Sequence, residues 1–319
     1  MESSKPAASE NRAEDPAKRR RRRRGRVLHV ILLAFAAVVR RLPLRLARAI
    51  GFLLGSLTSI VARRERRIAL QNITRAFPEW SERRRRATIR AMFRHLGMSL
   101  FEILWLPNVD VPIRDRTTVM EGTAPMLDIV DRGGGVIVFT GHCGNWEWLA
   151  FSTGLLGRPV SVLQRERNEA QLNRFITETR ARAGVRTIDR GSTASGRELI
   201  YSLRRGGILA FLIDQNIRTE SAKVPFFGVP ALTPIGPAKL VIRTGASIVT
   251  AFIERGADGL QHIRFSEPWT ASRDEDPVAL TARLTHEIEN QIRRVPEQWV
   301  WFHERWRERP EWEVAPPPV

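Results

Sequence analysis

The stretch GVIVFTGHCGNWEWLA, residues 135–150, joins a strand pattern to a helix pattern through a polar turn. Its first six residues are an apolar run that follows Arg132-Gly133-Gly134, which predicts a short buried strand. Further segments alternate in the same way: helix 81–106, strand 159–164, a helix to about 183, helix 196–205, strand 208–213, helix 235–243, strands 247–254 and 260–267, and helix 277–294. This alternation predicts an α/β fold with a mainly parallel central sheet flanked by helices.

Length and composition indicate one large domain. The chain has 319 residues, of which 43% are hydrophobic, enough for one catalytic-sized core with an N-terminal appendage. Cys143 is the single cysteine, so the sequence predicts neither an internal disulfide nor a multi-cysteine zinc site. The six histidines are scattered, and we expect no metal and no cofactor.

Charge points to anionic partners. The net charge is +18, and residues 1–30 carry ten Lys or Arg against four Asp or Glu. Nucleic acid, an anionic membrane surface, a phosphorylated substrate and an acidic carrier protein would all suit this balance. Because no groove-reading or aromatic-interleaved motif accompanies the arginines, we predict no nucleic-acid partner.

The N-terminal region has three possible interpretations: a signal peptide, a membrane anchor and a pair of core helices. Two apolar stretches, 27–39 and 49–62, are each too short for a perpendicular span, which needs ~20 residues. Arginines rather than a small-residue cleavage site follow the first stretch, which disfavours a signal peptide. Basic clusters at 18–26 and 63–67 flank the pair and favour an anchor with both ends on the cytoplasmic face.

These patterns divide the chain into four parts. We predict a disordered basic tail, a membrane-anchoring helical segment, the α/β domain and a Pro-rich tail, at 1–26, 27–67, 68–308 and 309–319.

Polar residues follow the predicted strands at the sheet edge where α/β proteins bind ligands. The first strand is followed by His142 and Glu147, and the strand at 208–213 is followed by Asp214. A histidine just before a helix can meet a carboxylate in the first turn of that helix. The carboxylate would fix the tautomer, and the other ring nitrogen could deprotonate a hydroxyl group.

Other candidates near this edge are weaker. Arg165 and Arg167 alternate after the strand at 159–164 and could both bind a phosphate or the thioester oxygen as charge develops on it, or they could be exposed to solvent. Asp214 should lie at the rim or pair with a cation, because a lone buried carboxylate is costly. Cys143 is expected to be a small apolar filler. His303 has no carboxylate of matching geometry and is not a candidate base.

Four ordered blocks carry a resemblance to a known family. They are RRERRIALQNITRAFPE (63–79), GHCGNWE (141–147), DQN with VPFFGVPALT (214–216 and 224–233), and PEQWVWFHERWR (296–307). The second block has the His-x4-carboxylate pattern of glycerolipid acyltransferases. From about residue 45 the sequence resembles the lipid A late acyltransferases and their relatives, the phosphatidylinositol mannoside acyltransferases.

The resemblance implies a glycerolipid acyltransferase-like fold and an inner-membrane enzyme with its catalytic domain on the cytoplasmic face. Such an enzyme moves a fatty acyl chain from an acyl carrier protein thioester, or a coenzyme A thioester, to a glycolipid hydroxyl. His142 would be the general base and Glu147 its partner. Substrate contacts would come from Asn145, Arg165, Arg167 and Asp214, and Asp214 could alternatively polarise His142. Gln164 and Glu166 depart from the family's usual aromatic residue and proline around the arginine.

Several alternatives stay open. The acceptor could be another lipid, such as a lysophospholipid or a phosphatidylinositol mannoside. A hydrolase could use the same pair with water, although the chain lacks a Gly-x-Ser-x-Gly elbow. A non-catalytic basic membrane or nucleic-acid binder would leave His142, Glu147 and Asp214 unexplained.

Overall fold

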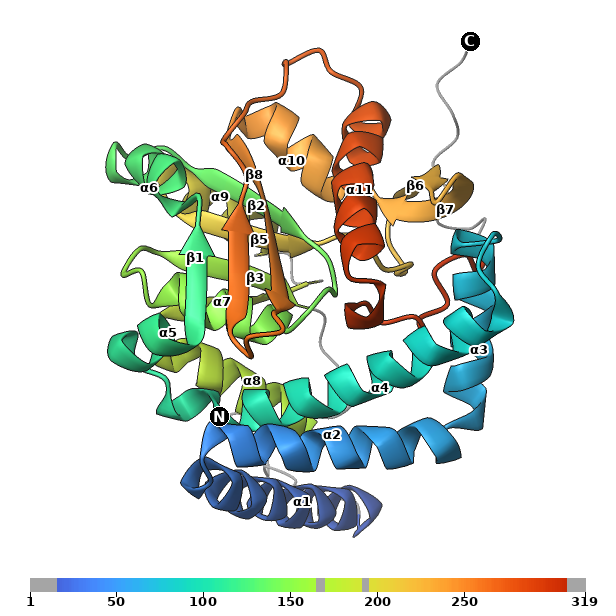
Figure 1. The fold of residues 1–319 in the computed structure, drawn as a ribbon. Helices are drawn as coiled ribbons and strands as arrows, with labels where there is room; N and C mark the ends of the chain where they lie inside the picture. Colours follow the sequence, from blue (N-terminus) through green and yellow to red (C-terminus); the bar gives the residue numbers. More distant parts are fainter. Residues whose placement is uncertain (1–15, 165–169, 191–194, 309–319) are drawn as a thin grey trace, which may run out of the picture.

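The computed structural model describes residues 16–164, 170–190 and 195–308 (Figure 1). The helices are α1 (Pro16–Arg41), α2 (Leu44–Val61), α3 (Arg63–Ala76), α4 (Glu82–Trp105), α5 (Val111–Thr117), α6 (Thr123–Asp131), α7 (Trp146–Gly154), α8 (Ala170–Arg182), α9 (Ser195–Arg204), α10 (Gly236–Thr244) and α11 (Pro277–Arg294), with the 3-10 turns η1 (Leu106–Asn108) and η2 (Pro296–Gln298). The strands are β1 (Thr118–Glu121), β2 (Val136–Thr140), β3 (Val160–Gln164), β4 (Val185–Asp189), β5 (Ile208–Leu212), β6 (Ser221–Phe226), β7 (Val229–Pro234), β8 (Ser247–Arg255) and β9 (Gln261–Phe265).

The central sheet is mainly parallel, as the sequence predicts. Within the described residues it has seven strands in the order β1-β9-β8-β2-β5-β3-β4. Only the β8–β9 pair in this sheet is antiparallel; the other neighbours in the described sheet run parallel. Strands β6 and β7 form a separate antiparallel hairpin. The α/β fold class is therefore confirmed.

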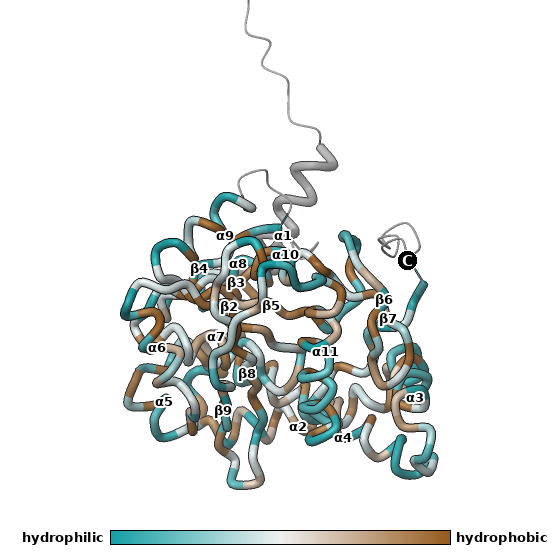
Figure 2. Tube along the Cα trace, turned by 90° about the horizontal axis from the view of Figure 1, so that it is seen from above, coloured by the Kyte–Doolittle hydropathy of each residue, from teal (hydrophilic) through white to brown (hydrophobic). Residues whose placement is uncertain are grey.

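Strand β2 lies inside the sheet because every one of its side chains can be buried. Ile137 and Phe139 belong to one apolar cluster, to which α3, α4, α10 and α11 contribute. Val136 and Val138 belong to a second cluster, to which α6 and α7 contribute. The continuous apolar run of β2 therefore packs against helices on both faces of the sheet. Figure 2 shows hydrophobic residues along the central strands and hydrophilic residues along the outer turns.

Helix α2 packs lengthwise on α4 through small residues. Ala47, Gly51, Gly55 and Ser59 recur at every fourth position and are its buried residues. A Cβ atom on Gly51 would lie 2.5 Å from the carbonyl oxygen of Gly97 in α4, so only glycine permits this approach.

The remaining sides of α1 and α2 present apolar side chains to solvent. The exposed ones are Val27, Val30, Ile31, Phe35 and Val38 of α1, and Leu46, Phe52, Leu53, Leu54, Leu57, Ile60 and Val61 of α2. Helix α2 is long and apolar enough to cross a membrane, and 22% of it is buried in the protein. The structure also begins α1 at Pro16, so this helix includes residues 16–26 of the segment predicted to be a disordered tail. Arginine favours helix, so the basic block can continue the apolar helix towards its N-terminus.

Candidate active site

His142 and Asp214 meet at the carboxyl edge of two paired strands. Thr140 of β2 is in register with Leu212 of β5, so residues 142 and 214 are neighbours two positions further on. His142 Nδ1 lies 2.8 Å from Asp214 Oδ1, and the backbone N–H of His142 donates to Asp214 Oδ2 at 2.7 Å. The parallel register therefore builds a histidine–carboxylate pair from residues 72 positions apart.

Asp214 is fully buried but has three hydrogen-bond donors. Two come from His142, and the third is Trp299 Nε1, which donates to Asp214 Oδ2 at 2.7 Å. Burial raises the pKa of Asp214, but the charge on His142 and these hydrogen bonds outweigh it and lower the pKa to about 2. An ionised carboxylate can only accept, so His142 Nδ1 is the donor, and in the neutral ring Nε2 therefore carries the lone pair.

Glu147 does not meet His142, contrary to the sequence prediction. It lies in the first turn of α7 and forms a bidentate ion pair with Arg180 of α8, at 2.7 Å and 2.8 Å. The guanidinium also donates to Gln164 Oε1 at 2.8 Å. His142 and Glu147 do not form the predicted hydrogen bond for two reasons. Asp214 already accepts from His142 Nδ1, and Arg180 donates to both carboxylate oxygens of Glu147.

Asn145, a predicted substrate contact, is buried at the start of α7 and is not among the residues that line the cavity beside His142. Its side chain is buried: Oδ1 caps α7 by accepting from the Trp148 N–H at 3.2 Å, and Nδ2 donates to Glu102 Oε2 at 2.8 Å. Glu102 is itself fully buried between Arg48 and Arg255. Asn145 therefore fixes the turn that carries His142. The other predicted contacts, Arg165 and Arg167, lie outside the described residues.

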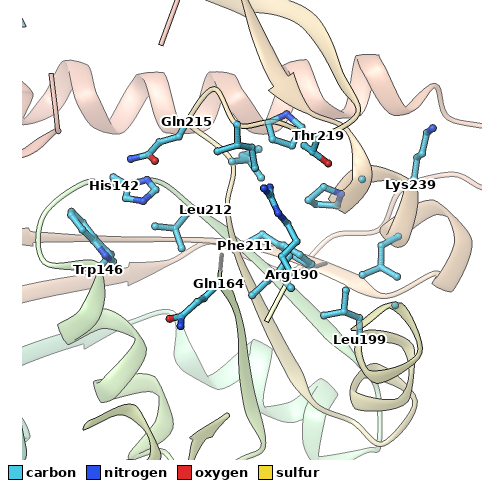
Figure 3. Close-up of a pocket in the computed structure, with 18 of the residues that line it drawn as sticks. His142, Trp146, Gln164, Arg190, Leu199, Phe211, Leu212, Gln215, Thr219 and Lys239 are labelled. Atoms are coloured by element: carbon cyan, nitrogen blue, oxygen red, sulfur yellow. The ribbon is translucent and has the colours of Figure 1, made fainter. Parts of the chain in front are cut away.

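A cavity of about 950 Å³ opens beside the pair (Figure 3). His142 and Trp146 lie at one side of it, and Leu199 and Lys239 lie at the other. Its apolar lining is Leu163, Leu199, Ile200, Phe211, Leu212, Ile213, Ile217 and Leu240. Its cationic lining is Arg180, Arg190, Arg197, Lys239 and Arg243. Apolar walls with several cations suit a ligand that has both an acyl chain and an anionic group.

The C-terminal block brings in residues that the sequence analysis did not place at the site. Trp299 donates to Asp214, and His303 lines the cavity. Arg305 is fully buried, donates to the Leu232 carbonyl and to Thr233 Oγ1 of β7, and has its pKa lowered by burial to about 10. These contacts fasten the segment beside the site. The cluster of tryptophans around His303 is the signal that could have indicated burial here.

Cys143 is confirmed as a packing residue. Its side chain is buried in the apolar cluster on one side of the sheet. Burial, together with the negative charge of Asp214, raises the pKa of the thiol well above its usual value, so the nucleophilic thiolate is disfavoured. Over the described parts of the chain, no three His, Cys, Asp or Glu side chains come together to hold a metal ion.

Comparison with known proteins places the chain among acyltransferases. The family model described as bacterial lipid A biosynthesis acyltransferase matches residues 16–308. The chain belongs to this family.

Two lipid A acyltransferases are similar to this chain over most of their length, and a mannoside acyltransferase is similar over about half. The lipid A biosynthesis palmitoleoyltransferase of Escherichia coli (strain K12) is 28% identical over 274 residues, which cover 85% of this chain and 88% of that protein. The lipid A biosynthesis lauroyltransferase of the same organism is 27% identical over 280 residues, covering 86% and 89%. A phosphatidylinositol mannoside acyltransferase of Mycobacterium tuberculosis (strain ATCC 25618 / H37Rv) is 26% identical over 182 residues, covering 54% and 55%.

Proposed function

We propose that this acyltransferase moves a fatty acyl chain from an acyl carrier protein thioester to a hydroxyl group of a lipid A-type glycolipid, with His142 as general base. The observation that carries the proposal is the hydrogen bond from His142 Nδ1 to buried Asp214 at 2.8 Å. It leaves Nε2 as the ring nitrogen that can take a proton, on a residue that borders the cavity.

The reaction follows from this arrangement. The acceptor hydroxyl gives its proton to His142 Nε2 while its oxygen forms a bond to the thioester carbonyl carbon. The tetrahedral intermediate then re-forms the carbonyl as the C–S bond breaks, and the imidazolium returns the proton to the leaving thiolate. Asp214 acts through His142 as a positioning residue, because it holds the ring and stabilises its charged form.

The cavity supports an amphiphilic substrate. Its apolar side chains can bury an acyl chain, and its cations can bind phosphate groups of an acceptor or of the carrier's prosthetic arm. Glu147 has a place in this scheme because it holds Arg180 at the cavity wall. The lipid A names of the relatives that match most of the chain favour a lipid A-type acceptor over a phosphatidylinositol mannoside, since the mannoside enzymes match only about half.

Membrane attachment is part of the proposal. The exposed apolar side chains of α1 and α2 would enter the bilayer, and basic residues on both sides of them would remain with anionic head groups on the cytoplasmic face of the inner membrane. In this scheme residues 1–26 and 27–67 serve attachment and residues 68–308 serve catalysis, while residues 309–319 form a tail.

The test is reconstituted transfer. The full chain in detergent receives acyl carrier protein thioester and either a lipid A precursor or a phosphatidylinositol mannoside, and the products are identified by mass spectrometry. We expect acyl ester on the lipid A precursor, loss of transfer with His142→Ala, and full transfer with Cys143→Ala. Release of free fatty acid in place of the ester would indicate a hydrolase, and acylation of the mannoside alone would replace the acceptor class.

A further inference from the structure

His303 lines the same cavity as His142, but its ring accepts a hydrogen bond from the protein whereas the His142 ring donates one. The backbone N–H of Asn216 donates to His303 Nε2 at 3.0 Å. An amide N–H can only donate, so Nε2 carries a lone pair and the hydrogen of the neutral ring is on Nδ1. Among the residues that the structure describes, no side chain forms a hydrogen bond with Nδ1.

The surroundings keep this ring neutral. Burial lowers the pKa of His303 to about 4. The charges of His142 and Arg305 lower it as well, while the negative charge of Asp214 and a hydrogen bond with the Asn216 backbone raise it without outweighing burial. At neutral pH the residue therefore presents an N–H donor and has little capacity to take a proton.

The loop after β5 thus sets two histidines for opposite tasks. Asp214 accepts from His142 and leaves that ring with an acceptor nitrogen, whereas the N–H of Asn216, two residues further on, donates to His303 and leaves that ring with a donor nitrogen. We propose that His303 Nδ1–H is an oxyanion donor that binds the thioester carbonyl oxygen as negative charge develops on it. This assignment rests on the proposed acyl transfer.

The step balances as follows. His142 Nε2 takes the hydroxyl proton, the acceptor oxygen bonds to the carbonyl carbon, and the carbonyl π electrons move to the oxygen that His303 Nδ1–H contacts. When the C–S bond breaks, these electrons re-form the carbonyl and the thiolate receives the proton from His142. A preorganised neutral donor suits this task because it stabilises the oxyanion without adding a second positive charge beside the His142 imidazolium.

The test compares His303→Ala with His303→Gln, whose amide can both accept from Asn216 N–H and donate to the oxyanion. Thr233→Val is the matched control, because it removes a 2.5 Å contact of Arg305 that fastens the same segment but lies outside the cavity lining. We expect His303→Ala to lower kcat by ~10²–10³ with little change in KM, as for the loss of one oxyanion donor. His303→Gln should recover at least ~10-fold, and Thr233→Val should lower the melting temperature while kcat stays within ~3-fold of wild type.

A second readout does not depend on activity. Nitrogen-15 NMR of histidine-labelled protein should show one ring, absent in His303→Gln, that stays neutral with its proton on Nδ1 down to about pH 5. An Nε2–H tautomer, a wild-type kcat in His303→Ala, no recovery in His303→Gln, or equal kcat losses in His303→Ala and Thr233→Val would each overturn the assignment. If instead the wild-type enzyme acylates no lipid acceptor, the proposed function itself fails, and the NMR result separates that outcome from an error about the tautomer.

Discussion

Replacing Asp214 by asparagine should reverse the tautomer of His142. Asp214 Oδ2 accepts two N–H groups, from the His142 backbone and from Trp299, each at 2.7 Å. The asparagine must therefore place its oxygen at the Oδ2 position, which leaves its NH₂ group facing His142 Nδ1. That nitrogen would then accept, the ring hydrogen would move to Nε2, and the base would lose the lone pair that takes the proton.

The size of the effect follows from this reversal. A reversed tautomer in a histidine–carboxylate pair costs ~10⁴ in kcat where it is known from a serine protease. We expect a loss of ~10³–10⁴ here, which corresponds to about 4–5.5 kcal/mol of transition-state stabilisation. KM should change little, because Asp214 is fully buried and does not line the cavity.

Glu147→Gln provides the matched comparison. It weakens a charged pair with Arg180 but leaves His142 and Asp214 intact. Loss of one charge-assisted hydrogen bond is worth about 1.5 kcal/mol, so kcat should fall by about 10-fold or less. Initial rates of transfer from radiolabelled acyl carrier protein to the lipid acceptor measure both variants. A nearly active Asp214→Asn beside an inactive Glu147→Gln would refute the reasoning and restore Glu147 as the partner of His142.

Three further predictions concern stability and attachment. His95 and His303 have folded-state pKa values lowered, chiefly by burial, to about 3 and about 4, so acidification below the unfolded value of about 6.5 adds protons to the unfolded chain first. The free energy of unfolding should therefore fall by up to about 1.4 kcal/mol per pH unit for each histidine as the pH is lowered from about 6.5 to 4. Chemical denaturation of His95→Gln should show a free energy of unfolding that depends less steeply on pH than that of wild type, and an equally steep dependence would contradict this. Gly97→Val should destabilise the protein by about 1–3 kcal/mol in denaturant titrations, because the new Cβ would meet Gly51 backbone, and a neutral result would mean that α2 does not pack on α4 this closely. Leu57→Glu, at an exposed position of α2, should weaken vesicle co-sedimentation while transfer to detergent-dispersed acceptor persists, and unchanged sedimentation would argue against insertion of this face.

The interior strands could be predicted because burial on both faces leaves a continuous apolar run. The outer strands β1 and β4 were missed, since they carry polar residues such as Glu121, Arg186 and Asp189 that suit sheet edges. The β6–β7 hairpin was missed for another reason: prolines interrupt both strands, and its turn is Phe227-Gly228 in place of a sequence such as Asn-Gly. Both turn residues have positive φ. The Phe227 N–H donates to buried Glu289 Oε2 at 2.6 Å, and this contact with α11 is a tertiary one that the local sequence pattern does not reveal.

The site was predicted in part for a related reason. The sequence indicates His142, Glu147 and Asp214 as residues of one sheet edge, because each follows a strand pattern. It does not indicate strand order, and only the pairing of β2 with β5 shows that Asp214, instead of the nearer Glu147, reaches the imidazole. Because strand order is not visible in the sequence, the proposed donor role of His303 could not be predicted either: its partner Asn216 comes from the loop after β5.

A single-turnover experiment tests the central claim most directly. Enzyme in excess is mixed with labelled acyl carrier protein thioester and the lipid A precursor, and the label is followed at early times for wild type and His142→Ala. The account predicts that wild type moves the label to an ester of the glycolipid and that His142→Ala, although it retains both substrates, transfers it at least ~10³-fold more slowly. A His142→Ala protein that transfers the label at the wild-type rate would contradict the assignment of His142 as the base.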